Sequence, residues 1–309
     1  MNKPLVSIVI PTRNSANTLP LCLKSIMKQT YKNIEIIVID NFSNDKTREI
    51  AKQFGARVYL LPCERTKAKN IGTLLAKGKY ILYLDSDMIL SRNVIEKCVN
   101  TMENQPHIGG IIIPEISFGK SLLAHLRLYE RICYFHTEME SARFYRRDLV
   151  LQAHGFDEDL LLYEEASLHE KVQKMGYKIS RVPTPIIHLE NTHLWPFLKK
   201  RLRYAVTLHR FIKRYHNRKA VADPTYRMKL IIRILKKLST PIPIILLILL
   251  LKSIEQAAYY ISILTSITNI KSQDSTYEIQ TIIQDKTRKK QYLHDTQKRV
   301  PCRERFHSN

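Results

Sequence analysis

Short apolar runs alternate with amphipathic stretches over the first 115 residues of the chain. One apolar run ends at Pro11, a second ends at Asp40, and a third ends just before Asp85. The stretches between these runs carry apolar residues at helical spacing, so the pattern predicts strands that alternate with helices. This order is typical of an α/β fold with a mostly parallel central sheet and helices on both faces.

Polar clusters follow three of the predicted strands, at Pro11–Asn14, Asp40–Asp45 and Asp85–Asp87. Ligands of such sheets bind beyond the carboxyl ends of the strands, so we expect the three clusters to converge at one edge. Asp85 and Asp87 are one residue apart and can point the same way from the strand end. Their carboxylates would suit Mg²⁺ or Mn²⁺. An Asx turn that begins a helix is the ordinary structural explanation of the same pair.

Two adjacent acids open a helix that the pattern predicts from Glu164 to Met175, ended by Gly176. Acidic side chains favour the first turn of a helix for structural reasons alone, so Glu164 and Glu165 are not by themselves a site. An extended segment then leads to His188.

Charge is distributed unevenly in this chain of 309 residues, whose net charge is +22. Between Lys199 and Lys237 there are fourteen lysines and arginines and one acid, Asp223, a local net charge of +13. Such a block favours an anionic partner, either nucleic acid or an acidic membrane surface.

An apolar run of eleven residues at 241–251 follows the basic block and is closed by Lys252 and Glu255. A bilayer span takes about 20 apolar residues, so we expect an interfacial or re-entrant hairpin here, with a single span as the alternative. Soluble proteins rarely expose such a run, which favours the membrane over nucleic acid as the partner.

The polar clusters, taken in order, resemble family 2 glycosyltransferases of the GT-A fold over most of residues 4–190. The matching segments share the order and spacing of that family: 9–14, 38–47, 68–72, 83–87, 142–147, 155–158 and 163–165. The resemblance implies an enzyme that uses a nucleotide-sugar donor.

The resemblance assigns roles to the residues at the predicted sheet edge. Pro11, Thr12 and Asn14 would line the nucleotide-sugar pocket, Asp40 would accept a hydrogen bond from the base, and Lys69 would contact ribose or phosphate. Asp85 and Asp87 would hold Mg²⁺ or Mn²⁺ against the two phosphates. His188 would add a metal ligand, and an ordinary histidine near Pro185 is the alternative.

The catalytic base is implied at Glu165, with Glu164 beside it. Inverting transfer needs a carboxylate that takes a proton from the acceptor hydroxyl. Relatives carry Asp where this chain has Glu165, and the extra methylene moves the carboxylate by about 1 Å. The pocket has therefore shifted, or activity is reduced or lost. Asn41 replaces a second Asp of the family, which bears on base or sugar preference.

The predicted function is inverting, metal-dependent transfer of a sugar to a hydroxyl of a lipid-linked or cell-surface glycan acceptor. We expect it at the cytoplasmic face of the cell membrane, with an anionic membrane surface and no nucleic acid as partner. A polyprenyl-phosphate sugar synthase is an alternative, in which Arg143, Arg146 and Arg147 would grip the lipid phosphate. A basic nucleic-acid-binding protein and an inactive scaffold are alternatives of other classes.

Four regions follow from these patterns. Residues 1–195 form the GT-A domain, 196–237 a basic helical region, 238–270 an apolar membrane-associated segment, and 271–309 a polar, disordered tail. The five dispersed cysteines indicate reduced thiols in a cytosolic compartment. The N-terminus shows no signal-peptide pattern.

Overall fold

The computed structural model describes residues 3–190, 193–205, 207–215, 223–237, 240–254, 256–257 and 260–261. One compact unit runs from Met1 to Tyr259, and a second runs from Tyr260 to Asn309. The account below concerns the first unit. The predicted tail at 271–309 and residues 262–270 of the apolar segment lie outside the described residues.

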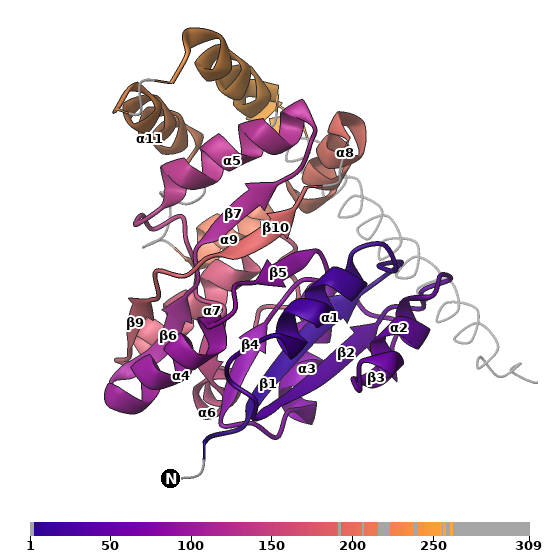
Figure 1. Ribbon diagram of the computed structural model, residues 1–309. Coiled ribbons are helices and arrows are strands. Elements are labelled where there is room, and N and C mark those ends of the chain that lie inside the picture. The colour runs from indigo at the N-terminus through magenta and orange to yellow at the C-terminus, as the bar shows by residue number, and fades with distance from the viewer. Residues whose placement is uncertain are drawn as a thin grey trace, which may run out of the picture. The chain divides into compact units, whose positions relative to one another are not determined.

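A seven-stranded sheet forms the centre of this unit, in the order β3-β2-β1-β4-β8-β6-β9 (Figure 1). Its strands are β1 (Val6–Thr12), β2 (Ile34–Asp40), β3 (Arg57–Leu60), β4 (Tyr80–Tyr83), β6 (Ile108–Ile112), β8 (Phe144–Arg146) and β9 (Lys178–Arg181). Only β8 runs antiparallel to its neighbours, which confirms the predicted α/β fold with a mostly parallel sheet. In β1 and β2 the register sets Thr12 beside Asp40, so these strands end at the same edge.

Two apolar cores cover the two faces of the sheet. Helices α1 (Leu19–Met27), α2 (Thr47–Gln53) and α4 (Val94–Asn104) contribute to one core, and α3 (Arg65–Leu75), α6 (Arg147–Gln152) and α7 (Glu164–Lys174) to the other. Helix α3 lies unusually close to the sheet, because a Cβ atom at Gly72 would come within 2.3 Å of Val9 Cγ1. The first turn of α3 lies at the carboxyl edge, where Arg65 and Ala68 adjoin Pro11 and Thr12.

A second sheet of three strands was not expected from the sequence. It has the order β5-β10-β7 and is made of β5 (Met88–Leu90), β10 (Ile186–Leu189) and β7 (Glu115–Phe118). The extended segment predicted up to His188 is divided between β9 in the large sheet and β10 in the small one. Strand β10 sets His188 opposite Met88, the residue after Asp87, and so brings the histidine to the end of β4.

The basic and apolar regions fold onto this framework as a layer of helices. Helices α5 (Leu122–Tyr134), α8 (Leu194–Ala205) and α11 (Pro224–Lys237) share an apolar cluster with the helix at 242–254. Helix α9 (Leu208–Arg214) joins this region to the start of α7, where the Phe211 and Tyr163 rings lie 5.1 Å apart. None of the described helices is both long and apolar enough to cross a bilayer.

Lys252, which interrupts the apolar segment, is buried within the protein. Its Nζ atom lies 2.5 Å from the Glu130 carboxylate of α5, which also contacts Arg127, Arg227 and the Tyr134 hydroxyl. Burial alone would raise the pKa of Glu130, but the surrounding cations hold that pKa well below its ordinary value. The ion cluster therefore ties the 242–254 helix to α5.

We expect Glu130→Gln to destabilise the compact unit by about 3–5 kcal/mol, because it leaves buried cations without their carboxylate. The lowered pKa means that this stabilisation is complete above the ordinary pKa of a glutamate and is lost as the pH falls through the folded-state value. Unfolding free energies from urea titration measure both effects. Glu64→Gln, which removes an exposed pair with Arg203, should cost less than about 1 kcal/mol. Equal costs for the two variants would contradict a structural role for the buried cluster.

Candidate active site

Two adjoining pockets of about 320 and 340 Å³ open at the carboxyl edge of the large sheet. Both are lined by the same six residues, which mark the junction between them: Arg65, Asp85, Asp87, His188, Lys200 and Tyr204. Lys200 and Tyr204 belong to α8, so this helix borders the junction from the side of the helical layer. The pockets are therefore two halves of one cleft with the paired aspartates between them.

The first half of the cleft lies beyond β1 and β2. Pro11, Thr12 and Asn41 line it, as expected for the first two from the sequence. Asp40 is fully buried beneath them, and its oxygens accept hydrogen bonds from the Thr12 hydroxyl and from the backbone and hydroxyl of Ser43. In this structure Asp40 orders the two loops, and Asn41 is the neighbour that reaches the pocket.

Asn14 also connects the loops that follow β1 and β2. Its side-chain oxygen accepts a hydrogen bond from the Asn44 backbone at 2.9 Å, and its own backbone N–H donates to the Ser43 hydroxyl. The positive φ of 49° at Asn14 suits an Asn residue at such a turn. Asn14 is not among the residues that line either half of the cleft.

Asp85 and Asp87 each have one carboxylate oxygen engaged and one buried without a partner. Asp85 Oδ2 lies 3.8 Å from Arg65 and 3.6 Å from Arg143, and Asp87 Oδ2 lies 3.2 Å from His188 Nε2. The Oδ1 atoms of both aspartates are buried and lack any hydrogen-bond donor. Two orphaned carboxylate oxygens fit a hard divalent cation.

No cage of three or more acidic, His or Cys side chains is preformed within the part of the chain that the structure describes. This is compatible with Mg²⁺, which proteins often hold by one or two carboxylates while substrate phosphates complete its shell. Asp85 and Asp87 would be its protein ligands, and His188 lies next to Asp87.

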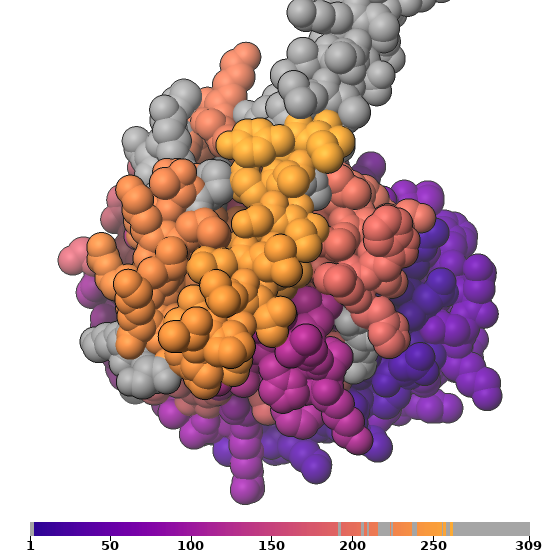
Figure 2. Space-filling view, turned by 90° about the horizontal axis from the view of Figure 1, so that it is seen from above, coloured from indigo at the N-terminus to yellow at the C-terminus, as the bar shows by residue number. Residues whose placement is uncertain are grey.

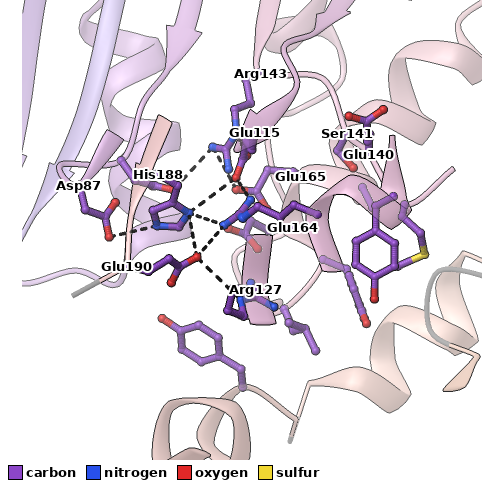
Figure 3. A pocket seen from close by; sticks show the side chains of 18 of the residues that line it. Asp87, Glu115, Arg127, Glu140, Ser141, Arg143, Glu164, Glu165, His188 and Glu190 are labelled. Atoms are coloured by element: carbon purple, nitrogen blue, oxygen red, sulfur yellow. Dashed lines mark hydrogen bonds and ion pairs between the residues drawn. The ribbon is translucent and has the colours of Figure 1, made fainter. Parts of the chain in front are cut away.

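Charged side chains surround His188 and hold its imidazole in place (Figure 3). Its Nδ1 atom contacts the Arg131 guanidinium, and Arg131 also pairs with Glu115. Burial and Arg131 would lower the pKa of His188, but hydrogen bonds to Asp87 and Glu115 raise it above the ordinary value. The imidazole is therefore fixed toward Asp87 by contacts on its far side.

Glu164 and Glu165 lie across the cleft from the aspartates, in the first turn of α7. Tyr163, just before them, adopts a left-handed conformation with φ of 64°. Glu164 is almost fully buried, whereas the Glu165 side chain retains 18% of its exposure. Lys69, predicted to contact the donor, is instead fully buried between the two, with Nζ 3.3 Å from Glu164 and 2.6 Å from Glu165.

The two glutamates have opposite pKa shifts. Burial raises the pKa of Glu164, and the neighbouring Glu165 adds to the effect. Burial would raise the pKa of Glu165 as well, but Lys69, Arg65 and Arg143 outweigh it and lower that pKa. Glu165 is thus an ionised carboxylate in the pocket wall at neutral pH. Two neighbouring carboxyl groups whose pKa values are shifted in opposite directions are characteristic of acid–base sites.

Arg65 is a site residue that the sequence analysis missed. It lies one helical turn before Lys69 in α3, and its guanidinium lies 2.5 Å from Glu164 and faces Asp85. The spacing of four residues from Lys69 was the available signal, because positions four apart share a helix face. Arg65 joins the glutamate side of the cleft to the aspartate side.

The three arginines proposed for a phosphate acceptor do not act together. Arg143 lines the second half of the cleft and pairs with Glu115 at 2.6 Å. Arg146 donates to the backbone carbonyls of Ile108 and Met102, and Arg147 donates to that of Thr73. The structure therefore leaves only Arg143 at the site.

Comparisons with known proteins show the family to which the chain is similar. Residues 7–159 match the model of the family described as glycosyl transferase family 2. A glycosyltransferase of Streptococcus pneumoniae serotype 4, GlyG, is 43% identical over 99 residues, or 30% of this chain and 33% of that protein. In Escherichia coli, WfgD, named a UDP-Glc:alpha-D-GlcNAc-diphosphoundecaprenol beta-1,3-glucosyltransferase, is 37% identical over 107 residues, or 33% of this chain and 42% of that protein. The matches thus span between a third and a half of these relatives.

A solved structure extends the likeness over most of the chain. The mannosyltransferase PcManGT of Pyrobaculum calidifontis, in complex with GDP-Man and Mn²⁺, is 18% identical, with a TM-score of 0.60 over 85% of this chain and 88% of that one. This likeness shows the GT-A fold. The family match and the curated relatives confirm the resemblance noted in the sequence, and the chain belongs to glycosyl transferase family 2.

Proposed function

We propose that the chain transfers a sugar, with inversion, from a nucleoside diphosphate sugar to a hydroxyl of a lipid-linked or cell-surface glycan. The observation that carries this proposal is the cleft itself. Orphaned carboxylate oxygens of Asp85 and Asp87 stand at its middle, and ionised Glu165 lines the half away from the β1–β2 pocket. By its name, WfgD acts on GlcNAc that a diphosphate joins to undecaprenol, which supports the lipid-linked acceptor class.

The donor nucleotide would occupy the half of the cleft lined by Pro11, Thr12 and Asn41. Asp85 and Asp87 would hold Mg²⁺ or Mn²⁺ there, and the ion would supply positive charge to the diphosphate. Arg65 and Arg143 lie beside Asp85 and add fixed cations to the same place. These groups are set before the reaction begins, so they stabilise the leaving group without reorganising.

The acceptor would enter the other half, where Glu165 takes the proton of its hydroxyl group. The acceptor oxygen forms a bond to the anomeric carbon as the bond from that carbon to the phosphate oxygen breaks. The electron pair leaves with the nucleoside diphosphate, and the proton stays on Glu165. Lys69 and Arg143 hold the Glu165 carboxylate ionised and in place until then.

A polyprenyl phosphate acceptor is the second candidate. One observation favours it: Arg143 Nη1 is buried without a hydrogen-bond partner and lies 3.7 Å from Glu165. Assays of polyprenyl phosphate and of a lipid-linked glycan with the same donor distinguish the two acceptors.

We expect Asp87→Asn to abolish metal-dependent donor binding, because it removes one of two carboxylate ligands. Thermal shift with a panel of UDP, GDP and dTDP sugars, each with and without Mn²⁺, measures this and also identifies the nucleotide. Asp148→Asn, which alters an exposed aspartate of α6, is the matched control. Wild-type Mn²⁺ dependence in Asp87→Asn would remove the metal assignment.

Glu165→Gln should lower kcat by at least roughly 100-fold while donor binding is retained, because the amide cannot accept the acceptor proton. Single-turnover assays with saturating donor measure the chemical step, and calorimetry measures donor binding. Full activity in this variant would exclude Glu165 as the base.

Lys69→Met should move the acidic limb of the kcat/KM profile to higher pH. Lys69 lowers the pKa of Glu165, so without it the base becomes protonated at a higher pH. Lys67→Met alters an exposed lysine of the same helix and should leave the limb unchanged. An acidic limb that stays in place in Lys69→Met, with activity retained, would assign the base elsewhere.

A further inference from the structure

The 242–254 helix exposes an apolar stripe on the side away from the protein core. Ile242, Leu246 and Leu250 recur every fourth residue and are 71%, 60% and 57% exposed, and Ile254 continues the row. The opposite side packs Ile248 and Leu251 into the cluster shared with α5, α8 and α11. One face of this helix therefore has a partner within the protein and the other faces outward.

Basic side chains flank the stripe. Figure 2 shows the helix running across one face of the molecule between α11 and α8. On α11, exposed Lys229, Arg233 and Lys236 follow helical spacing and point away from the same core. Neither flanking helix nor the 242–254 helix contains an acidic residue. The face thus combines an apolar strip with the exposed cations Lys229, Arg233 and Lys236.

The single cation inside the apolar segment is withdrawn from this face. Lys252 is 6% exposed and pairs with Glu130 of α5, so no charge interrupts the stripe. An outward apolar strip between cations is the arrangement of helices that lie in the plane of a membrane interface. The row from Ile242 to Ile254 would reach the acyl boundary while the lysines and arginines meet headgroups.

We propose that this face, formed by the 242–254 helix with α8 and α11, binds the surface of an anionic membrane. A second copy of the chain fits less well, because pairing would bring like-charged α11 helices together. Nucleic acid would neutralise the cations but leave the apolar strip in water. The proposal does not depend on the sugar-transfer chemistry, since vesicle binding needs no donor.

The position of the face links it to the cleft. Helix α5 shares an apolar cluster with the stripe-bearing helix. Its Arg127, Arg131 and Tyr134 line the half of the cleft assigned to the acceptor. Helix α8 likewise contributes to both. An acceptor anchored in the bound membrane would therefore meet its pocket across the thickness of one helix layer.

Co-sedimentation of the full chain with vesicles tests the proposal. We expect binding to phosphatidylcholine mixed with phosphatidylglycerol, and at least tenfold weaker binding to phosphatidylcholine alone. The double variant Leu246→Ser/Leu250→Ser should lower binding at least tenfold at both roughly 0.1 M and 1 M salt, because burial of leucine depends little on screening. Leu74→Ser, at an exposed leucine of α3, is the control.

The triple variant Lys229→Gln/Arg233→Gln/Lys236→Gln should lower binding by roughly 100-fold at low salt, since each cation contributes roughly fivefold near an anionic leaflet. At high salt, where the charges of the wild type are screened, the substitutions should lower vesicle binding only slightly. The matched control is Lys24→Gln/Lys28→Gln/Lys52→Gln, which changes exposed lysines in α1, just after α1 and in α2, and it should bind like wild type. Circular dichroism and donor binding report whether each variant is folded.

Three results would overturn the proposal. One is wild-type vesicle binding in both stripe and charge variants. Another is a concentration-dependent dimer, measured by light scattering, that the stripe variant disperses while no form of the chain binds vesicles. The third is salt-dependent binding of an oligonucleotide, lost in the charge variant, with no vesicle binding. Retained turnover on a water-soluble acceptor in any of these cases would leave the proposed chemistry intact.

Discussion

A fully buried ammonium group holds the two walls of the cleft together. Lys69 has no exposed surface. A buried ammonium group is stable only when carboxylates pair closely with it. Glu164 and Glu165 provide them from α7, while α3 itself is fixed against β1 by the close approach at Gly72. Moving α7 away would leave an unpaired charge in a dry interior. The distance between the sheet edge and the glutamate pair is therefore set by electrostatics as much as by apolar packing.

The same pairing shapes the chemistry of the cleft. Arg65 connects Glu164 to Asp85, and Arg143 connects Asp85 to Glu165 and Glu115. The carboxylates proposed to hold a cation and the one proposed to accept a proton are thus neighbours with shared counterions. In the proposed reaction, the charge of a bound diphosphate and the transfer of a proton would each act on both sets of carboxylates. The pKa values of Glu164 and Glu165 therefore depend on the charges of the whole cluster.

A second buried ion cluster, around Glu130, holds together the helices of the helical layer. Glu130 forms ion pairs with Arg127, Arg227 and Lys252, which lie on three helices. One side of the apolar 242–254 helix is therefore packed against the rest of the protein. The other apolar side of this helix forms the exposed stripe. Because α5 carries Glu130 and also lines the cleft, the layer that would contact a membrane and the layer that would receive the acceptor are one layer.

Local pattern alone determined a large part of this protein. The alternation of strands and helices, the convergence of Pro11, Asp40 and Asp85 at one edge, and the family itself were readable from order and spacing. These features depend on short-range periodicity and on the rule that parallel strands end together. The metal, base and membrane roles stay predictions, now attached to defined atoms.

Only the tertiary structure decided which polar residues face the cleft and which support it. Lys69 and Asp40 are buried supports, whereas Arg65, Arg131 and Glu115 reach the site. Sequence could not separate them, because the partners of each lie far along the chain: Lys69 pairs with residues 95 and 96 positions away. In the sequence Lys252 closes an apolar run, and in the fold it is paired with Glu130. A buried charge is acceptable only where a partner meets it, and that meeting is fixed by the packing of whole helices.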